Sequence, residues 1–136
     1  MRVVFDTNVL LIALPVASPY RPLFDALREG RFELAVSNDI LLEYHEKLAE
    51  KTSAVVADNV TKLLLSLDNV VRQPVYFDWN LMTNDPEDNK FVDCAVGAQA
   101  DHLVTDDRHF NLLKSVSFPI VSVLGSDDFL HLVTAR

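Results

Sequence analysis

The sequence predicts an α/β fold built around a mainly parallel sheet. Three observations support this: apolar segments of strand length recur, segments with helical spacing alternate with them, and turn residues separate the two kinds. The 136 residues are 49% hydrophobic, which is enough to form a buried core. We therefore expect residues 1–136 to form a single domain, since this length is typical of one.

The first 36 residues predict a strand, two helices and a second strand, in that order. Residues 2–5 are a short apolar strand that ends at Asp6, and residues 10–14 are a short helix that stops before Pro15. An amphipathic helix follows from about residue 23 and ends at Gly30, because glycine is favoured just after a helix. Residues 32–36 are the second strand.

Two consecutive helices and an extended segment are expected next. Ser37 or Asn38 can cap a helix with apolar residues at positions 40, 41, 44 and 48. The following helix has apolar residues at positions 56, 60, 63, 64 and 67. Residues 69–77 are apolar around Pro74, and we expect them to be extended.

The remaining residues continue the alternation of helices and strands. A turn at residues 84–88 opens a helix over residues 89–100, which leads into a strand at residues 102–105. A short helix at residues 108–113, a strand at 119–123 and a last helix at 127–132 complete the chain. Strands that alternate with helices in this way pair in parallel.

Negative charge is concentrated in one stretch of the chain. The formal net charge is −8, and residues 78–107 contain eight acids but a single base, Lys90. Apolar residues are interspersed among these acids, so a solvated acidic face does not account for the whole pattern. Buried or crowded carboxylates are costly unless they are paired or bound to a cation. The pattern therefore favours a cluster of acids that binds a metal ion.

Acids from distant parts of the sequence converge if the sheet is parallel. Asp6 ends the first strand, and Asp106 and Asp107 follow the strand at residues 102–105. Asp88 begins the helix that leads into that strand, and Glu43 lies in the second turn of the helix after the second strand. Ligands of open α/β sheets bind outside the carboxyl ends of the strands. We therefore expect these acids at one rim of the sheet.

Carboxylate ligands without histidine or cysteine select Mg²⁺ or Mn²⁺ over zinc. Ions held in this way assist the hydrolysis of phosphodiesters, because they activate water and stabilise the leaving oxygen. Thr7, Asn8 and Thr105 lie beside the acids and can orient bound water or contact a phosphate. Arg108 follows the last acid, so it is the best-placed base to guide a nucleic acid into the site.

Several of these acids also have an ordinary structural interpretation. Asp6 can cap the turn after the first strand, and Asp88 can be only a helix N-cap. Glu43 can pair with Lys47 one turn further along its helix. These alternatives remain open at the level of the sequence.

Four segments resemble, in order, the motifs of the PIN domain family. They are Phe-Asp-Thr-Asn-Val-Leu at 5–10, residues 37–43, Asp-Pro-Glu-Asp-Asn-Lys-Phe at 85–91 and Leu-Val-Thr-Asp-Asp at 103–107. The likeness covers nearly the whole chain and is strongest to the VapC-like toxins of bacterial toxin–antitoxin systems. It implies a three-layer α/β/α fold and a Mg²⁺- or Mn²⁺-dependent endoribonuclease.

The resemblance also implies roles for individual acids. The four acids of the family, which bind metal and carry the catalysis, are matched by Asp6, Glu43, Asp88 and Asp107. Asp93 stands where relatives often have a further acid, although it lies about 140° around an ideal helix from Asp88. Many relatives have glycine at the position of Asp106, so either Asp106 or Asp107 can be the nearer ligand.

The partners that the resemblance implies are RNA, a cognate antitoxin protein and a second copy of the chain in a homodimer. No apolar segment approaches the roughly 18 residues of a membrane span, and the N-terminus does not resemble a signal peptide. The single cysteine, Cys94, fits a reducing compartment, so we expect a cytoplasmic protein. The alternative function is a non-catalytic PIN-fold module that binds RNA or a protein.

Overall fold

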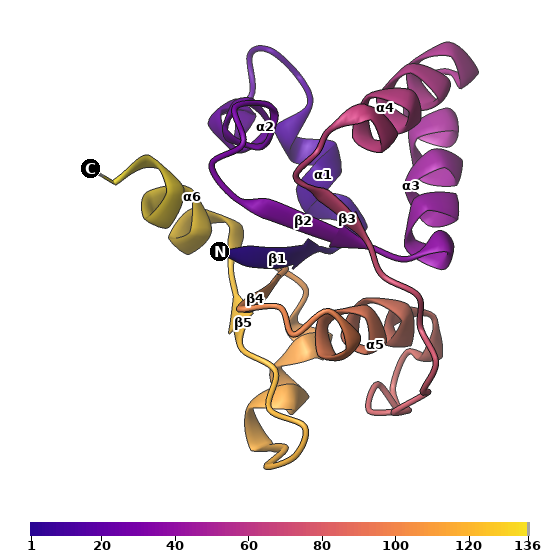
Figure 1. The fold of residues 1–136 in the computed structure, drawn as a ribbon, viewed down its shortest axis with the longest axis vertical. Helices are drawn as coiled ribbons and strands as arrows, with labels where there is room; N and C mark the ends of the chain where they lie inside the picture. Colours follow the sequence, from indigo (N-terminus) through magenta and orange to yellow (C-terminus); the bar gives the residue numbers. More distant parts are fainter. Residues whose placement is uncertain (136) are drawn as a thin grey trace.

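The computed structural model describes residues 1–135 and places five strands of this range in one sheet (Figure 1). The strands are β1 (Arg2–Phe5), β2 (Glu33–Val36), β3 (Val70–Arg72), β4 (His102–Val104) and β5 (Val123–Leu124). Their order is β3-β2-β1-β4-β5, and each neighbouring pair is parallel. The predicted parallel sheet is confirmed, and its strand order reverses between β1 and β4.

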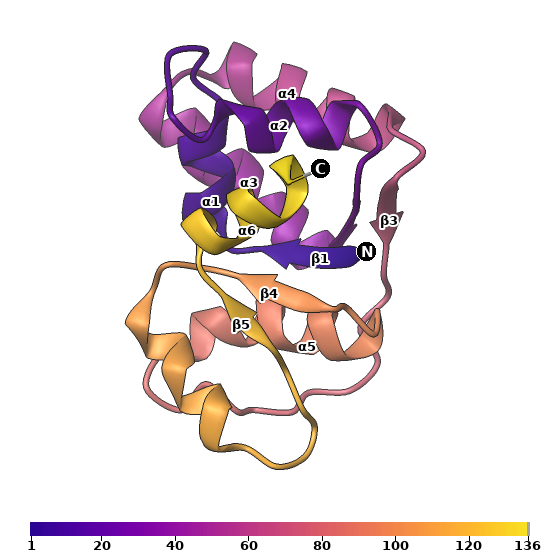
Figure 2. The same ribbon diagram turned by 90° about the vertical axis from the view of Figure 1, so that its left-hand side faces the viewer.

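Helices cover both faces of the sheet and complete the expected three-layer α/β/α arrangement (Figure 2). One face carries α1 (Thr7–Ala13), α2 (Arg21–Arg28), α3 (Asn38–Lys51), α4 (Ala54–Ser66) and α6 (Ser126–Thr134). The other face carries α5 (Asn89–Gly97) and the 3-10 helix η2 (Arg108–Ser115). A second 3-10 helix, η1 (Pro86–Asp88), leads directly into α5. Among residues 1–135, no helix has the length and apolar character needed to cross a membrane.

The central strand β1 is fixed by packing on both sides. Val3 and Val4 are fully buried, and the ring of Phe5 lies 5.6 Å from that of Phe32 and 5.8 Å from that of Phe129. The buried hydroxyl of Tyr44, on α3, donates a hydrogen bond of 2.6 Å to the carbonyl oxygen of Phe5. These contacts hold the carboxyl end of β1, where Asp6 begins, against α3.

The first helix begins earlier than its apolar pattern predicts. We expected residues 10–14, but α1 covers Thr7–Ala13, because the carbonyl oxygen of Asp6 already accepts hydrogen bonds from the amides of Val9 and Leu10. Thr7 and Asn8 therefore lie in the first turn of α1. The predicted helix end at Gly30 is confirmed, since Gly30 has a φ of 76° and follows Glu29, the C-cap of α2.

The other differences concern the ends of elements. α5 ends at Gly97 and not at residue 100, because Gln99 adopts a left-handed φ of 53° and the amide of Ala100 bonds back to Ala95. β3 is shorter than the expected segment 69–77, and β5 lies later than the expected 119–123. Pairing sets the bounds of both strands. The residues of β3 pair with Leu34–Val36 of β2, and the residues of β5 pair with Leu103 and Val104 of β4.

Candidate metal centre

An open pocket of about 570 Å³ lies at the carboxyl ends of β1 and β4. Its walls come from the starts of α1 and α5, from η1, from the C-terminal part of α3 and from the segment between β4 and η2. The expected acids that line this pocket are Asp6, Glu43, Asp88 and Asp107. Because the strand order reverses between β1 and β4, the pocket occupies the position where open α/β sheets bind ligands.

Asp6 is buried at the end of β1, with 6% of its surface exposed. The hydroxyl of Thr105 donates a 2.8 Å hydrogen bond to Asp6 Oδ2, and the same hydroxyl accepts a 3.0 Å hydrogen bond from the amide of Asp107. Burial raises the pKa of Asp6, and repulsion from Asp107 and Glu43 raises it further, against the opposing hydrogen bonds. Thr105 thus links the ends of β1 and β4 and orients the Asp6 carboxylate.

Asp88 is an acid of the pocket with a raised pKa and one carboxylate oxygen that lacks a donor. Burial, followed by repulsion from Asp85, Asp6, Asp107 and Glu43, raises the pKa of Asp88 to about 7. Its Oδ2 is buried and has no hydrogen-bond partner among residues 1–135. A buried carboxylate oxygen without a donor, among further carboxylates, is a suitable ligand for a hard divalent cation. The residues present therefore fit Mg²⁺ or Mn²⁺.

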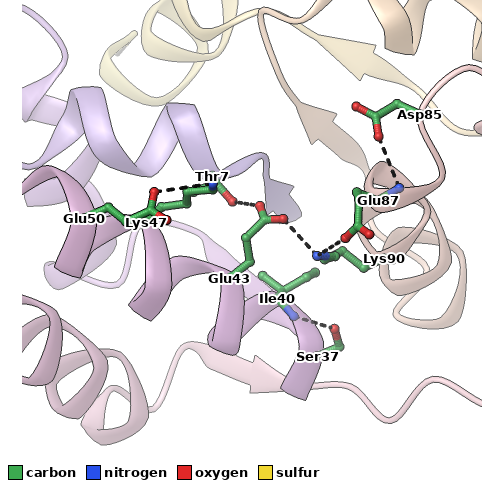
Figure 3. A network of polar contacts seen from close by, with 9 residues as sticks. All are labelled: Thr7, Ser37, Ile40, Glu43, Lys47, Glu50, Asp85, Glu87 and Lys90. Atoms are coloured by element: carbon green, nitrogen blue, oxygen red, sulfur yellow. Dashed lines mark hydrogen bonds and ion pairs between the residues drawn. The ribbon is translucent and has the colours of Figure 1, made fainter.

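Glu43 has partners for both of its carboxylate oxygens (Figure 3). The Thr7 hydroxyl donates to Oε2, and the Lys90 ammonium donates to Oε1 at 2.9 Å. The helical spacing suggested a pairing of Glu43 with Lys47. The Lys47 ammonium instead lies 3.5 Å from Glu50 Oε2. The side chain of Glu43 is therefore held by the first turns of α1 and α5.

The adjacent residues Asp106 and Asp107 face different surroundings. Asp107 lines the pocket, and its Oδ1 accepts the amide hydrogen of His109 at 2.9 Å, so it also caps η2. The Asp106 carboxylate accepts hydrogen bonds from the amide and hydroxyl of Ser126, at 2.8 and 2.6 Å, where α6 begins. Asp107 is thus the member of the pair on the pocket, whereas Asp106 serves the start of α6.

The other expected residues lie at different distances from the pocket. Thr7 and Asn8 line it, while Arg108 is exposed at the start of η2. Asp93 is buried on α5, where its Oδ1 accepts the amide hydrogen of Trp79 at 3.1 Å, and it lines a neighbouring pocket instead. Burial raises the pKa of Asp93.

The sequence analysis assigned no metal-binding or catalytic role to three residues that lie near the site: Asp85, Lys90 and His109. Within residues 1–135, one ligand atom each from Asp85, Asp88 and His109 lie within 4.8 Å of one another. Lys90 contacts Glu43 from α5. The sequence feature that could have pointed to Lys90 is its position as the single base among the acids of residues 78–107. For His109, the only such feature is that it lies two residues after Asp107 in the sequence.

The fold and the pocket together define an α/β/α protein with a carboxylate site at the point where a parallel sheet reverses its strand order. The model of the PIN domain family matches residues 2–109. The chain therefore belongs to the PIN domain family, as the four sequence motifs predicted. None of the curated proteins matches this sequence.

Solved structures with the same fold include two DNA-bound VapBC structures. A chain of VapBC2 from Rickettsia felis, bound to a promoter DNA fragment, has a TM-score of 0.63 and 16% identity, covering 92% of this chain and 98% of that one. A Pyrobaculum aerophilum protein has a TM-score of 0.62 and 17% identity, covering 99% and 90%. DNA-bound VapBC from Salmonella typhimurium has a TM-score of 0.58 and 12% identity, covering 93% and 98%. At these identities the likeness shows the fold.

Proposed function

We propose that this protein is a Mg²⁺- or Mn²⁺-dependent endoribonuclease that hydrolyses RNA phosphodiester bonds. The observation that carries the proposal is the convergence of four acids on one pocket at the reversal point of the sheet. The chain's membership of the PIN domain family supports it. So does the lack of a hydrogen-bond donor, within residues 1–135, for the buried Oδ2 of Asp88.

Of the four acids in the pocket, Asp6, Asp88 and Asp107 would offer carboxylate oxygens to the divalent ion. Glu43 would lie beside the ion, with its oxygens accepting from Thr7 and Lys90. When bound, such an ion polarises a phosphate group and makes the water bound to it more acidic. Thr105 and Thr7 hold the carboxylates of Asp6 and Glu43 through their hydroxyls, so both are oriented by the protein itself. Fixing the Asp6 carboxylate in this way raises metal affinity, because less ordering remains for the binding step.

RNA would reach this site in spite of the acidic character of the protein. A bound divalent ion reverses the sign of the potential at the carboxylates, so a phosphate is attracted locally. Asn8 lines the pocket and can donate its amide to a phosphate or sugar oxygen. Arg108, exposed beside Asp107 in the sequence, is placed to meet the RNA backbone.

We further propose that the protein is the toxin of a cytoplasmic toxin–antitoxin pair. Two of the structures that share its fold are described as VapBC complexes. This role would give it an antitoxin protein as its partner in addition to RNA.

Asp93 and Asp106 would support the fold around the site, since both carboxylates hold backbone amides outside the pocket.

Cleavage of a labelled single-stranded RNA tests the proposal. We expect cleavage with Mn²⁺ or Mg²⁺ and none with EDTA, and we expect Asp6→Asn and Asp107→Asn to lower the rate about 100-fold or more. Asp68→Asn is the matched control, because Asp68 is exposed before β3 at the opposite, amino-terminal end of the sheet. It should keep the wild-type rate.

Two results would contradict the nuclease. Equal rates in the wild type, Asp6→Asn and Asp107→Asn would show that cleavage does not use this pocket. RNA binding without cleavage in the presence of either metal would support the alternative of a non-catalytic binding module.

A further inference from the structure

The pocket contains a cation that belongs to the protein itself. Lys90 lies in the first turn of α5, with only 18% of its side chain exposed. Its ammonium lies 2.9 Å from Glu43 Oε1 and 3.7 Å from Glu87 Oε2, between the two carboxylates (Figure 3). A partly buried ammonium loses some of its hydration, and the two carboxylates compensate this loss.

This ammonium divides the pocket into two halves with different charge balance. In the first half, Glu43 is satisfied on both oxygens by Lys90 and Thr7. In the second half, the buried Oδ2 of Asp88 has no donor within residues 1–135.

The neighbours of Asp88 on that side are further acids and the imidazole of His109. One ligand atom of Asp85 and one of Asp88 lie within 4.8 Å of each other. Asp6 and Asp107 line the same pocket and add to the repulsion at Asp88. The uncompensated negative charge is therefore concentrated away from Glu43.

A divalent ion binds where negative charge lacks a partner and is repelled by a fixed ammonium nearby. Resting on the metal site of the proposed function, we propose that Lys90 takes the place of a second metal ion. The pocket then binds one divalent ion, on the side of Asp6, Asp88 and Asp107. Lys90 is a positioning residue that neutralises Glu43 and keeps one positive charge permanently in the site.

The test counts the Mn²⁺ ions bound per chain, in the absence of RNA, by calorimetry and by the electron paramagnetic resonance of free Mn²⁺. The wild type should bind one ion, and Lys90→Gln should bind a second one at the vacated Glu43. Lys90→Arg keeps the charge and should stay at one ion. Lys47→Gln is the matched control, because Lys47 lines the same pocket but pairs with Glu50.

A second measurement does not depend on the folding of the Lys90 variants. Glu43→Gln should keep one Mn²⁺ with less than a tenfold change in affinity, whereas Asp88→Asn should weaken binding more than tenfold. Equal losses in these two variants would overturn the division of the pocket into halves.

The outcomes separate this inference from the proposed function. Two ions in the wild type, together with RNA cleavage, would overturn the role of Lys90 and leave the nuclease intact. One ion in both the wild type and Lys90→Gln would also overturn that role. A wild type that binds no Mn²⁺ and cleaves no RNA would overturn both.

Discussion

At the scale of single residues, the acids of the pocket differ in how far the protein compensates their charge. Glu43 has two donors and Asp6 has the Thr105 hydroxyl, whereas Asp88 Oδ2 has none within residues 1–135. Crowded carboxylates destabilise the metal-free fold, because their mutual repulsion is present only in the folded state. Function at such a site therefore costs stability, and a bound cation would restore it.

The raised pKa of Asp88 predicts a pH dependence of stability in EDTA. The folded pKa is about 7 and the ordinary value is 3.8, so the proton is held more tightly in the folded state. The stabilisation is complete below the unfolded pKa and is lost as pH rises through the folded one. We expect the Tm of the metal-free protein to fall between about pH 5 and pH 8.

Asp88→Asn should flatten this decline, because the amide does not ionise, while the control Asp68→Asn should keep the wild-type profile. Thermal melts followed by circular dichroism measure the effect. Coincident profiles of Asp88→Asn and the wild type would contradict the assignment.

At the scale of elements, the acids lie where strands end and helices begin. Asp6 joins β1 to α1, and Asp107 joins β4 to η2. Asp88 joins η1 to α5, and Asp106 supports the start of α6 from across the sequence. The same junctions that need capping therefore also position the carboxylates of the pocket, and neighbouring residues can serve the two purposes separately.

Asp106→Ala should lower the free energy of unfolding by about 1 kcal/mol, as the loss of a helix-capping side chain does. It should change Mn²⁺ affinity less than twofold, because its carboxylate is held by Ser126 outside the pocket. Asp107→Asn should instead weaken Mn²⁺ binding about tenfold or more. Urea denaturation and calorimetry measure the two quantities.

If Asp106→Ala weakened Mn²⁺ binding as much as Asp107→Asn did, Asp106 would be a ligand. The sequence left open whether Asp106 or Asp107 is the nearer ligand, and this result would favour Asp106.

At the scale of the whole molecule, the net charge of −8 opposes association with RNA. Attraction would be limited to a bound divalent ion and to exposed bases such as Arg108. Nucleic-acid affinity that depends on a few phosphate contacts decreases with added salt, since counterions compete for the phosphates.

We expect RNA binding in EDTA to be weak and to decrease further between about 50 and 200 mM salt. Fluorescence anisotropy of a labelled RNA measures it, and the presence of EDTA also prevents cleavage during the titration. A tight complex that salt does not weaken would contradict a site that recruits RNA through its metal.

Much of the fold was predictable from the sequence because it depends on local patterns. The parallel sheet, the helix end at Gly30 and the placing of Asp6 after the first strand all follow from apolar periodicity and turn residues. The family motifs are also local, and the match over residues 2–109 confirms the family. The ends of β3 and β5 were not predictable, since they depend on pairing with β2 and β4.

The sequence by itself determined the parallel α/β class and which acids could meet at one rim, and its resemblance to the PIN domain family implied the three layers. Only the tertiary structure decided which of them share the pocket, because the direction of a side chain depends on its partners. Asp106 faces Ser126 and Asp93 faces the amide of Trp79, while Asp107 lines the pocket. The pairing of Lys90 with Glu43 joins residues 47 positions apart, and spacing along one helix carries no information about such a contact.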